Sequence, residues 1–192
     1  MADGIRIGLD EVVVHFSELE DPRSEINRQH PLVSVVVIAL MAVLAGASGP
    51  TAIAKWARIK EDLLRKLLPL PNGIPRKDVF RRVLSALQPG AFQACFVNWL
   101  QSLRDAAAVA TGIDQPVLAV DGKTLRRSHD VTYREDESRI REKHLRENFA
   151  WLNRFTLSLL KQHPGKDSLV MKRRCCGWND NFLVQTLTGA TS

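Results

Sequence analysis

The first part of the chain, up to residue 112, places its hydrophobic side chains at the spacing of helices. The apolar run from Leu32 to Gly46 predicts a helix that is buried on nearly all sides. Two later segments repeat apolar residues at i, i+3, i+4 and i+7: Phe80, Val83, Leu84 and Leu87, then Phe92, Cys95, Phe96, Trp99, Leu100 and Leu103. Thr51 is expected to cap a second helix after the apolar run, and residues 69–75 form a proline-rich loop. Residues 1–112 are therefore predicted to form a helical domain with short loops.

The pattern changes in residues 113–130. Residues 117–120 form a short apolar run, typical of a buried strand, which ends at Asp121-Gly122-Lys123. A strand end followed by glycine presents a carboxylate rigidly, so Asp121 is a candidate ligand for Mg²⁺ or Mn²⁺. An Asp-Gly pair is also common in ordinary turns, and two-metal phosphoryl transfer needs several converging acids. One aspartate alone therefore does not define a catalytic site.

Residues 131–192 return to helical spacing. A helix is predicted from Glu135 to about Gln162, with an apolar stripe formed by Leu145, Phe149, Leu152, Phe155 and Leu159. Its basic residues fall on roughly the opposite arc: Arg139, Lys143, Arg146, Arg154 and Lys161. Because glutamates interleave with these cations, we interpret this arc as a solvated face. A basic run at residues 172–174 precedes a last amphipathic segment.

The composition narrows the class of partner and compartment. The formal net charge is +6 and the pI is near 9.5, which favours nucleic acid as a partner, although a merely basic protein has the same charge. Three cysteines, Cys95, Cys175 and Cys176, are too few and too unevenly spaced for a disulfide framework, which favours reduced thiols. There is no signal-peptide pattern and no apolar stretch of the ~20 residues that span a bilayer, so we expect a cytoplasmic protein without a membrane partner.

Several blocks of the sequence resemble the insertion-sequence DDE transposases of the H-repeat-associated family, in the same order. The blocks DPR, HPL, VLAGASG, GIPRKDVFRRVL and FVNWL are similar to the family's N-terminal associated domain, and AVDGKTLRRS is similar to its first catalytic block. The segment from VTYREDESRIR to FLVQTL resembles its extreme C-terminus. The resemblance implies a mainly α protein, in which the helical domain is followed by an incomplete remnant of an RNase H-like α/β domain. It also implies transposition chemistry at DNA element ends with Mg²⁺ or Mn²⁺, and only Asp121 carries over as a catalytic and metal-binding position.

The middle of the family's catalytic domain, with its second Asp and its catalytic Glu, has no counterpart in the sequence. The family segments on either side of the gap each contain an aspartate, which predicts an internal deletion joined at Asp130. The chain is therefore predicted to be a truncated and catalytically inactive copy. The acids at residues 135–137 are an alternative source of a second carboxylate. However, Glu135–Arg139 and Glu142–Arg146 have the i, i+4 spacing of ion pairs on a solvated helix, which favours a structural interpretation of these acids.

Two groups of basic residues are candidate DNA contacts. Lys77, Arg81 and Arg82 follow a loop and lie on a short predicted helix, as a DNA-reading helix would. The resemblance implies that Lys123, Arg126 and Arg127 lie beside DNA in an intact active site, where basic side chains hold phosphates.

Three functions are consistent with these residues. The favoured one is a truncated transposase that keeps Asp121 but does not cut or join strands. The second is a non-catalytic DNA-binding or oligomerising module that interferes with intact transposase, with DNA, a second copy of the chain or the intact enzyme as partner. The third is an active nuclease that uses Asp121 with Glu135 or Glu137.

Overall fold

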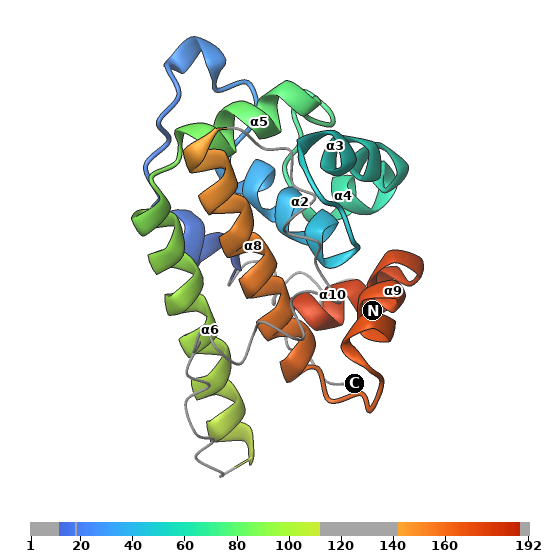
Figure 1. Ribbon diagram of the computed structural model, residues 1–192. Helices are drawn as coiled ribbons and strands as arrows, with labels where there is room; N and C mark the ends of the chain where they lie inside the picture. Colours follow the sequence, from blue (N-terminus) through green and yellow to red (C-terminus); the bar gives the residue numbers. More distant parts are fainter. Residues whose placement is uncertain (1–11, 18, 112–141, 189–192) are drawn as a thin grey trace.

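The computed structural model describes residues 12–17, 19–111 and 142–188, and within these ranges the chain forms helices and loops without a strand (Figure 1). After a short helix at residues 12–17, the elements are η1 (Glu25–Asn27), α2 (Leu32–Leu44), α3 (Pro50–Ile59), α4 (Glu61–Leu67), α5 (Lys77–Ala86), α6 (Pro89–Thr111), α8 (Lys143–Gln162), α9 (Leu169–Trp178) and α10 (Asp180–Thr188). The prediction of a mainly α protein is confirmed for this part of the chain. The expected strand at residues 117–120, and with it the RNase H-like remnant, lies outside the described residues.

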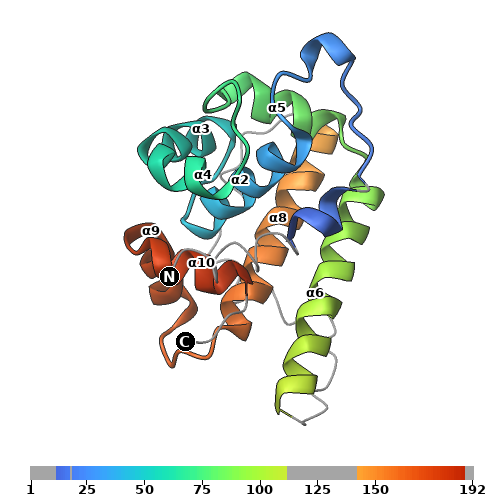
Figure 2. The same ribbon diagram turned by 180° about the vertical axis from the view of Figure 1, so that it is seen from behind.

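Helix α2 lies at the centre of the molecule (Figures 1 and 2). Every residue from Val35 to Leu44 is fully shielded from solvent, as the apolar run predicts. Helices α3, α5, α8, α9 and α10 all pack against it, because a helix without a polar face needs neighbours on every side. Near its start, the Ser34 hydroxyl donates a hydrogen bond to the carbonyl oxygen of Pro69 at 3.0 Å. Among the helices that the structure describes, none is both long and apolar enough to cross a membrane.

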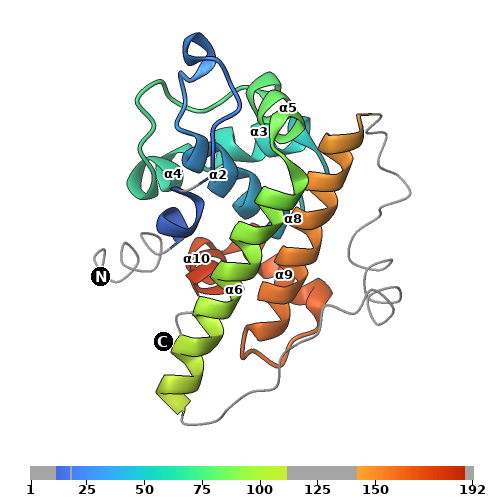
Figure 3. The ribbon, with the colours of Figure 1, turned by 90° about the vertical axis from the view of Figure 1, so that its left-hand side faces the viewer.

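Helix α8 shares one hydrophobic core with the N-terminal helices. It packs against α2, α5 and α6, and Figure 3 shows α6 and α8 side by side. The residues of its predicted apolar stripe are all buried: Leu145, Phe149, Leu152, Phe155 and Leu159. The Phe155 ring lies 4.4 Å from that of Phe96 and 4.8 Å from that of Trp99, measured between centroids. The two described segments on either side of residues 112–141 therefore fold together.

The last two helices attach to this core through polar contacts as well as apolar ones. Lys172 of α9 is buried, and its Nζ donates hydrogen bonds to the carbonyl oxygens of Leu160 at 3.2 Å and His163 at 2.6 Å. An ammonium group at the end of α8 also opposes the negative end of that helix dipole. Lys60, between α3 and α4, forms a 2.6 Å ion pair with Asp180 at the start of α10. The basic run of α9 therefore contains a lysine that caps another helix.

Two helix starts differ from the prediction. Helix α3 begins at Pro50 with Gly49 as its N-cap, so Thr51 is not the cap. Proline suits the first position of a helix because its missing N–H has no helical partner there. Helix α8 begins at Lys143 because Glu142 has extended backbone angles, so the predicted helix does not run through Glu142.

The cysteines are free thiols, as the sequence predicts. Cys95 and Cys175 are partly exposed, whereas Cys176 is buried. Burial raises the pKa of the Cys176 thiol to about 11, so this thiol stays protonated at neutral pH and is not a nucleophile there.

Candidate nucleic-acid interface

Helix α5 carries the basic residues that the sequence assigns to DNA, and its inner side is fixed by the core. That inner side consists of buried residues: Phe80, Val83, Leu84 and Leu87. Asn148 of α8 donates hydrogen bonds from Nδ2 to the carbonyl oxygens of Leu84 at 2.7 Å and Leu87 at 2.9 Å. The last carbonyl groups of a helix have no partner within the helix, so Asn148 caps α5 from outside. The helix is thereby held along one side and at its C-terminal end.

The outer side of α5 is basic. Lys77, Arg81 and Arg82 are all exposed, and so is Arg76, the N-cap residue, which was not among the basic residues predicted to contact DNA. Residues 76–82 contain four cations and one acid, Asp78. The carboxylate of Asp78 lies 4.0 Å from Arg81 Nε, and an exposed pair of this kind contributes little binding energy. The basic side chains therefore remain accessible to a polyanion.

A helix that is fixed by the core and carries exposed cations on its outer side is suited to contact the phosphates of nucleic acid. Long basic side chains on such a surface neutralise phosphate charges and release condensed counterions. Lys77 lies in the first turn of α5, where the helix dipole already places positive charge. A phosphate at this end would relieve the repulsion between the Lys77 ammonium group and the positive end of the helix dipole.

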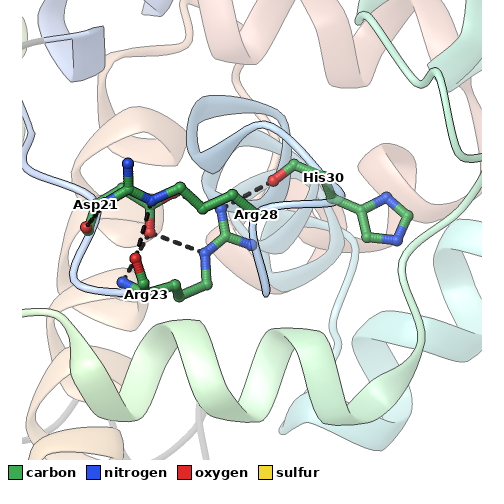
Figure 4. A network of polar contacts seen from close by, with 4 residues as sticks. All are labelled: Asp21, Arg23, Arg28 and His30. Atoms are coloured by element: carbon green, nitrogen blue, oxygen red, sulfur yellow. Dashed lines mark hydrogen bonds and ion pairs between the residues drawn. The ribbon is translucent and has the colours of Figure 1, made fainter. Parts of the chain in front are cut away.

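A second cluster of polar residues fixes the loop that precedes α2 (Figure 4). The guanidinium of Arg23 is buried and donates hydrogen bonds to the Asp21 carboxylate at 2.8 and 2.6 Å and to the His30 carbonyl oxygen at 2.8 Å. Arg28 donates to the carbonyl oxygens of Arg23 at 2.8 Å and Asp21 at 3.0 Å. The DPR and HPL blocks therefore have a structural role. In the sequence these two blocks stand out only through their resemblance to the family, although an acid and an arginine on either side of Pro22 are a signal for such a pair.

The ionisation of this cluster follows from its contacts. Partial burial alone would raise the pKa of Asp21, but hydrogen bonds from Arg23 and the charges of Arg23 and Arg28 outweigh it and hold the pKa below its usual value. Burial and the neighbouring charge of Arg23 lower the pKa of His30. At neutral pH the cluster therefore holds an ionised aspartate and a neutral histidine.

The predicted catalytic and metal-binding residue, Asp121, lies outside the described residues, as do Lys123, Arg126 and Arg127. Within residues 12–17, 19–111 and 142–188, no group of three or more His, Cys, Asp or Glu side chains is placed to hold a metal ion. The role of Asp121 stays a prediction from the sequence, with Mg²⁺ or Mn²⁺ as the ion implied for intact members of the family.

Comparison with known proteins assigns the N-terminal helices to a family. Residues 13–100 match the family model described as DDE_Tnp_1-associated. The chain is 46% identical over 115 residues to an "Uncharacterized protein in dhlA 3'region" of Xanthobacter autotrophicus, covering 59% of this chain and 37% of that protein. It is 32% identical over 126 residues to the H repeat-associated putative transposase YhhI of Escherichia coli K12, covering 66% of this chain and 32% of that protein. It is 28% identical over 124 residues to the putative transposase YncI of Escherichia coli O157:H7, covering 65% of this chain and 30% of that protein.

The chain therefore contains a DDE_Tnp_1-associated domain. Its homologues include two H repeat-associated putative transposases, in agreement with the family that the sequence blocks resemble. The chain spans between 30% and 48% of the length of the curated relatives it matches. No solved structure matches it.

Proposed function

We propose that this chain is an internally shortened relative of insertion-sequence transposases that binds DNA but does not cut or join strands on its own. The observation that carries the proposal is the outer side of α5, where Lys77, Arg81 and Arg82 are exposed on a helix that the core and Asn148 hold in place. Kinship with putative transposases makes DNA the natural polyanion for this surface. The ends of the parent element are the proposed target.

The proposed lack of strand cleavage rests on the sequence. Two-metal phosphoryl transfer needs several carboxylates that bring two ions about 3.5–4 Å apart. Of the family's catalytic acids, only Asp121 has a counterpart, and the join at Asp130 removes the segment that carries the others. In an intact relative, Mg²⁺ or Mn²⁺ would activate the attacking hydroxyl and stabilise the phosphate charge.

Strand nicking in the presence of Mg²⁺ or Mn²⁺ tests this proposal. The substrate is a labelled duplex that carries the terminal repeat of the element, compared with a scrambled duplex of equal length, and the proteins are the parent chain and its Asp121→Ala variant. We expect both proteins to retard the repeat duplex and neither to nick it. Nicking by the parent that Asp121→Ala abolishes would contradict the proposal. Glu135, Glu137 or a second subunit would then complete the site.

The same surface supports an interfering role. A chain that occupies element ends without cutting them competes with intact transposase for the same DNA. We expect added chain to reduce cleavage by an intact H repeat-associated relative in proportion to its occupancy of the repeat duplex. Removing the three cations of α5 should weaken this inhibition in step with the loss of DNA affinity, and undiminished inhibition would instead indicate contact between the two proteins.

A further inference from the structure

We propose that the start of α8 extends the DNA-binding surface of α5, so that the surface is built from both described segments of the chain. Its additional contacts are Lys143 and Arg146. The inference rests on the proposed function, because it adds residues to the same binding surface, and its partner is the phosphate backbone of duplex DNA.

A hydrogen bond places the two helices together at this point. Ser85, on α5, donates from Oγ to Glu142 Oε2 at 2.6 Å, and Glu142 is the N-cap of α8. Figures 1 and 3 show the start of α8 beside α5 at the same end of the molecule. Asn148, less than two turns further along α8, caps the end of α5. The relative position of the two helix ends is therefore fixed by three side-chain hydrogen bonds.

Cations lie within about one helical turn on both sides of this hydrogen bond. On α5, Arg81 and Arg82 come four and three residues before Ser85, and both are exposed. On α8, Lys143 follows Glu142 directly and Arg146 follows it by four residues, and both are exposed. Residues three or four apart on a helix are neighbours on its surface, which applies to Arg81, Arg82 and Arg146, and Lys143 adjoins Glu142 in sequence. The four cations therefore lie near one contact between two helices that are distant in sequence.

Among the residues that the structure describes, the acids near this contact leave the surface basic. The carboxylate of Glu142 accepts the hydrogen bond from Ser85, Asp78 pairs with Arg81 at 4.0 Å, and Glu147 is only partly exposed. With Arg76 and Lys77 at the start of α5, six cations accompany these three acids. The exposed cations of α8 therefore lie in two different surroundings. Those at the start of the helix adjoin α5, whereas those at its end do not.

The far end of α8 provides a matched comparison. Lys161 is exposed in the last turn of the helix, about 27 Å from Lys143 at ~1.5 Å per residue. This distance exceeds twice the screening length of roughly 8–10 Å at physiological salt. Arg174 on α9 is also exposed. The pair Lys161 and Arg174 has the same charge and residue types as Lys143 and Arg146 but lies away from α5.

The test measures binding of the full chain to a labelled repeat duplex over a range of salt concentrations. The variants are Arg81→Ala/Arg82→Ala, Lys143→Ala/Arg146→Ala and the control Lys161→Ala/Arg174→Ala, each checked by circular dichroism and urea unfolding. We expect each of the first two pairs to reduce the slope of log affinity against log salt by about two, at roughly 0.9 per phosphate contact. The control pair should leave the slope within experimental error.

Each outcome separates this inference from the proposed function. If only the α5 pair reduces the slope, DNA binding by α5 stands and the contribution of α8 is overturned. If the α8 pair and the control pair lower affinity equally, net charge explains the effect and the inference is again overturned. If no pair changes binding, or if the α8 pair acts without the α5 pair, both proposals fail. Equal affinity for single-stranded RNA of the same length would overturn duplex DNA as the partner.

Discussion

Asn148 Nδ2 donates a hydrogen bond to the carbonyl oxygen of Leu84 at 2.7 Å, across 64 residues of sequence. The contact joins α8 to the end of α5, the helix that carries the proposed DNA contacts. Because the amide also reaches the Leu87 carbonyl oxygen at 2.9 Å, one buried side chain completes the C-terminal end of a neighbouring helix. The stability of the proposed DNA-binding surface therefore depends on a residue outside the associated domain, because the family match ends at residue 100.

Replacing Asn148 by Leu is expected to destabilise the protein while nearly conserving side-chain volume. The variant leaves the carbonyl groups of Leu84 and Leu87 without their partner, and a buried unsatisfied group costs about 1–3 kcal/mol. We expect the free energy of unfolding in urea to fall by about 2 kcal/mol. Asn98→Leu, at an exposed position of α6, is the control and should change it little. Equal midpoints for the two variants would show that the cap contributes nothing.

Lys172 should matter for stability although it belongs to a basic run. Lys172→Met keeps much of the apolar length but removes the hydrogen bonds to the carbonyl oxygens of Leu160 and His163. Hydrogen bonds from a charged group contribute about 1.5–3 kcal/mol, and we expect a loss within that range by urea unfolding. Arg174→Met on the same helix is exposed and should change stability by less than about 0.5 kcal/mol. A larger loss for Arg174→Met than for Lys172→Met would contradict the assignment of the cap.

The contact between Phe155 and the aromatic rings of α6 should contribute strongly to folding. Phe155→Ala removes a buried ring that contacts Phe96 and Trp99, and such truncations cost about 3–5 kcal/mol. Phe155→Leu retains more volume and should lose less. Thermal unfolding monitored by tryptophan fluorescence and circular dichroism would measure both. If Phe155→Ala unfolds at the parent temperature, α8 does not share the core in solution.

Stability should decline as the pH falls from 7 toward 5, and His30 should cause part of the decline. Burial and the charge of Arg23 lower the pKa of His30 in the folded state, so the unfolded chain takes up a proton first as the pH falls below about 6.5. The contribution of neutral His30 to the free energy of unfolding is therefore complete above about pH 6.5. It decreases as the pH falls from there and stops decreasing once the pH is below the lowered folded-state pKa. Burial and the charge of Lys172 lower the pKa of His163 in the same way.

Urea unfolding at several pH values between 5 and 7 measures this effect. The slope of unfolding free energy against pH should be smaller for His30→Gln than for the parent, whatever the absolute stability of the variant. The double variant His30→Gln/His163→Gln should reduce the slope further. A parent stability that is constant across this range would contradict the burial of neutral histidines. Asp21 does not contribute to the slope between pH 5 and 7, because its pKa is lowered and its effect on stability falls in a more acidic range.

The helical period allowed much of the fold to be predicted. The buried sides of α5 and α8 follow directly from apolar residues at i, i+3 and i+4, and α2 from an apolar run that no exposed helix tolerates. The packing of α8 on α5 was not predicted, because a polar residue such as Asn148 gives no sign of a partner 64 residues away. The burial of Lys172 could not be predicted for the same reason, since a lysine in a basic run is ordinarily solvated.

The candidate site was predictable only in part. Lys77, Arg81 and Arg82 are exposed on one helix, as their spacing indicates. The sequence grouped Lys143 and Arg146 with the rest of a solvated arc, because helical spacing describes one helix and not its neighbours. Asp121, Lys123, Arg126 and Arg127 lie outside the described residues, so their roles stay predictions from the resemblance.

The central claim, that α5 binds DNA through its phosphates, is tested most directly by the salt dependence of binding to the repeat duplex. The comparison is between the parent chain, the variant Lys77→Ala/Arg81→Ala/Arg82→Ala, and the control Lys161→Ala/Lys166→Ala/Arg174→Ala, whose three cations are exposed away from α5. We expect the α5 variant alone to reduce the slope of log affinity against log salt, by about 2–3 at roughly 0.9 per phosphate contact. An unchanged slope for the α5 variant, or the same reduction for the control, would contradict the account.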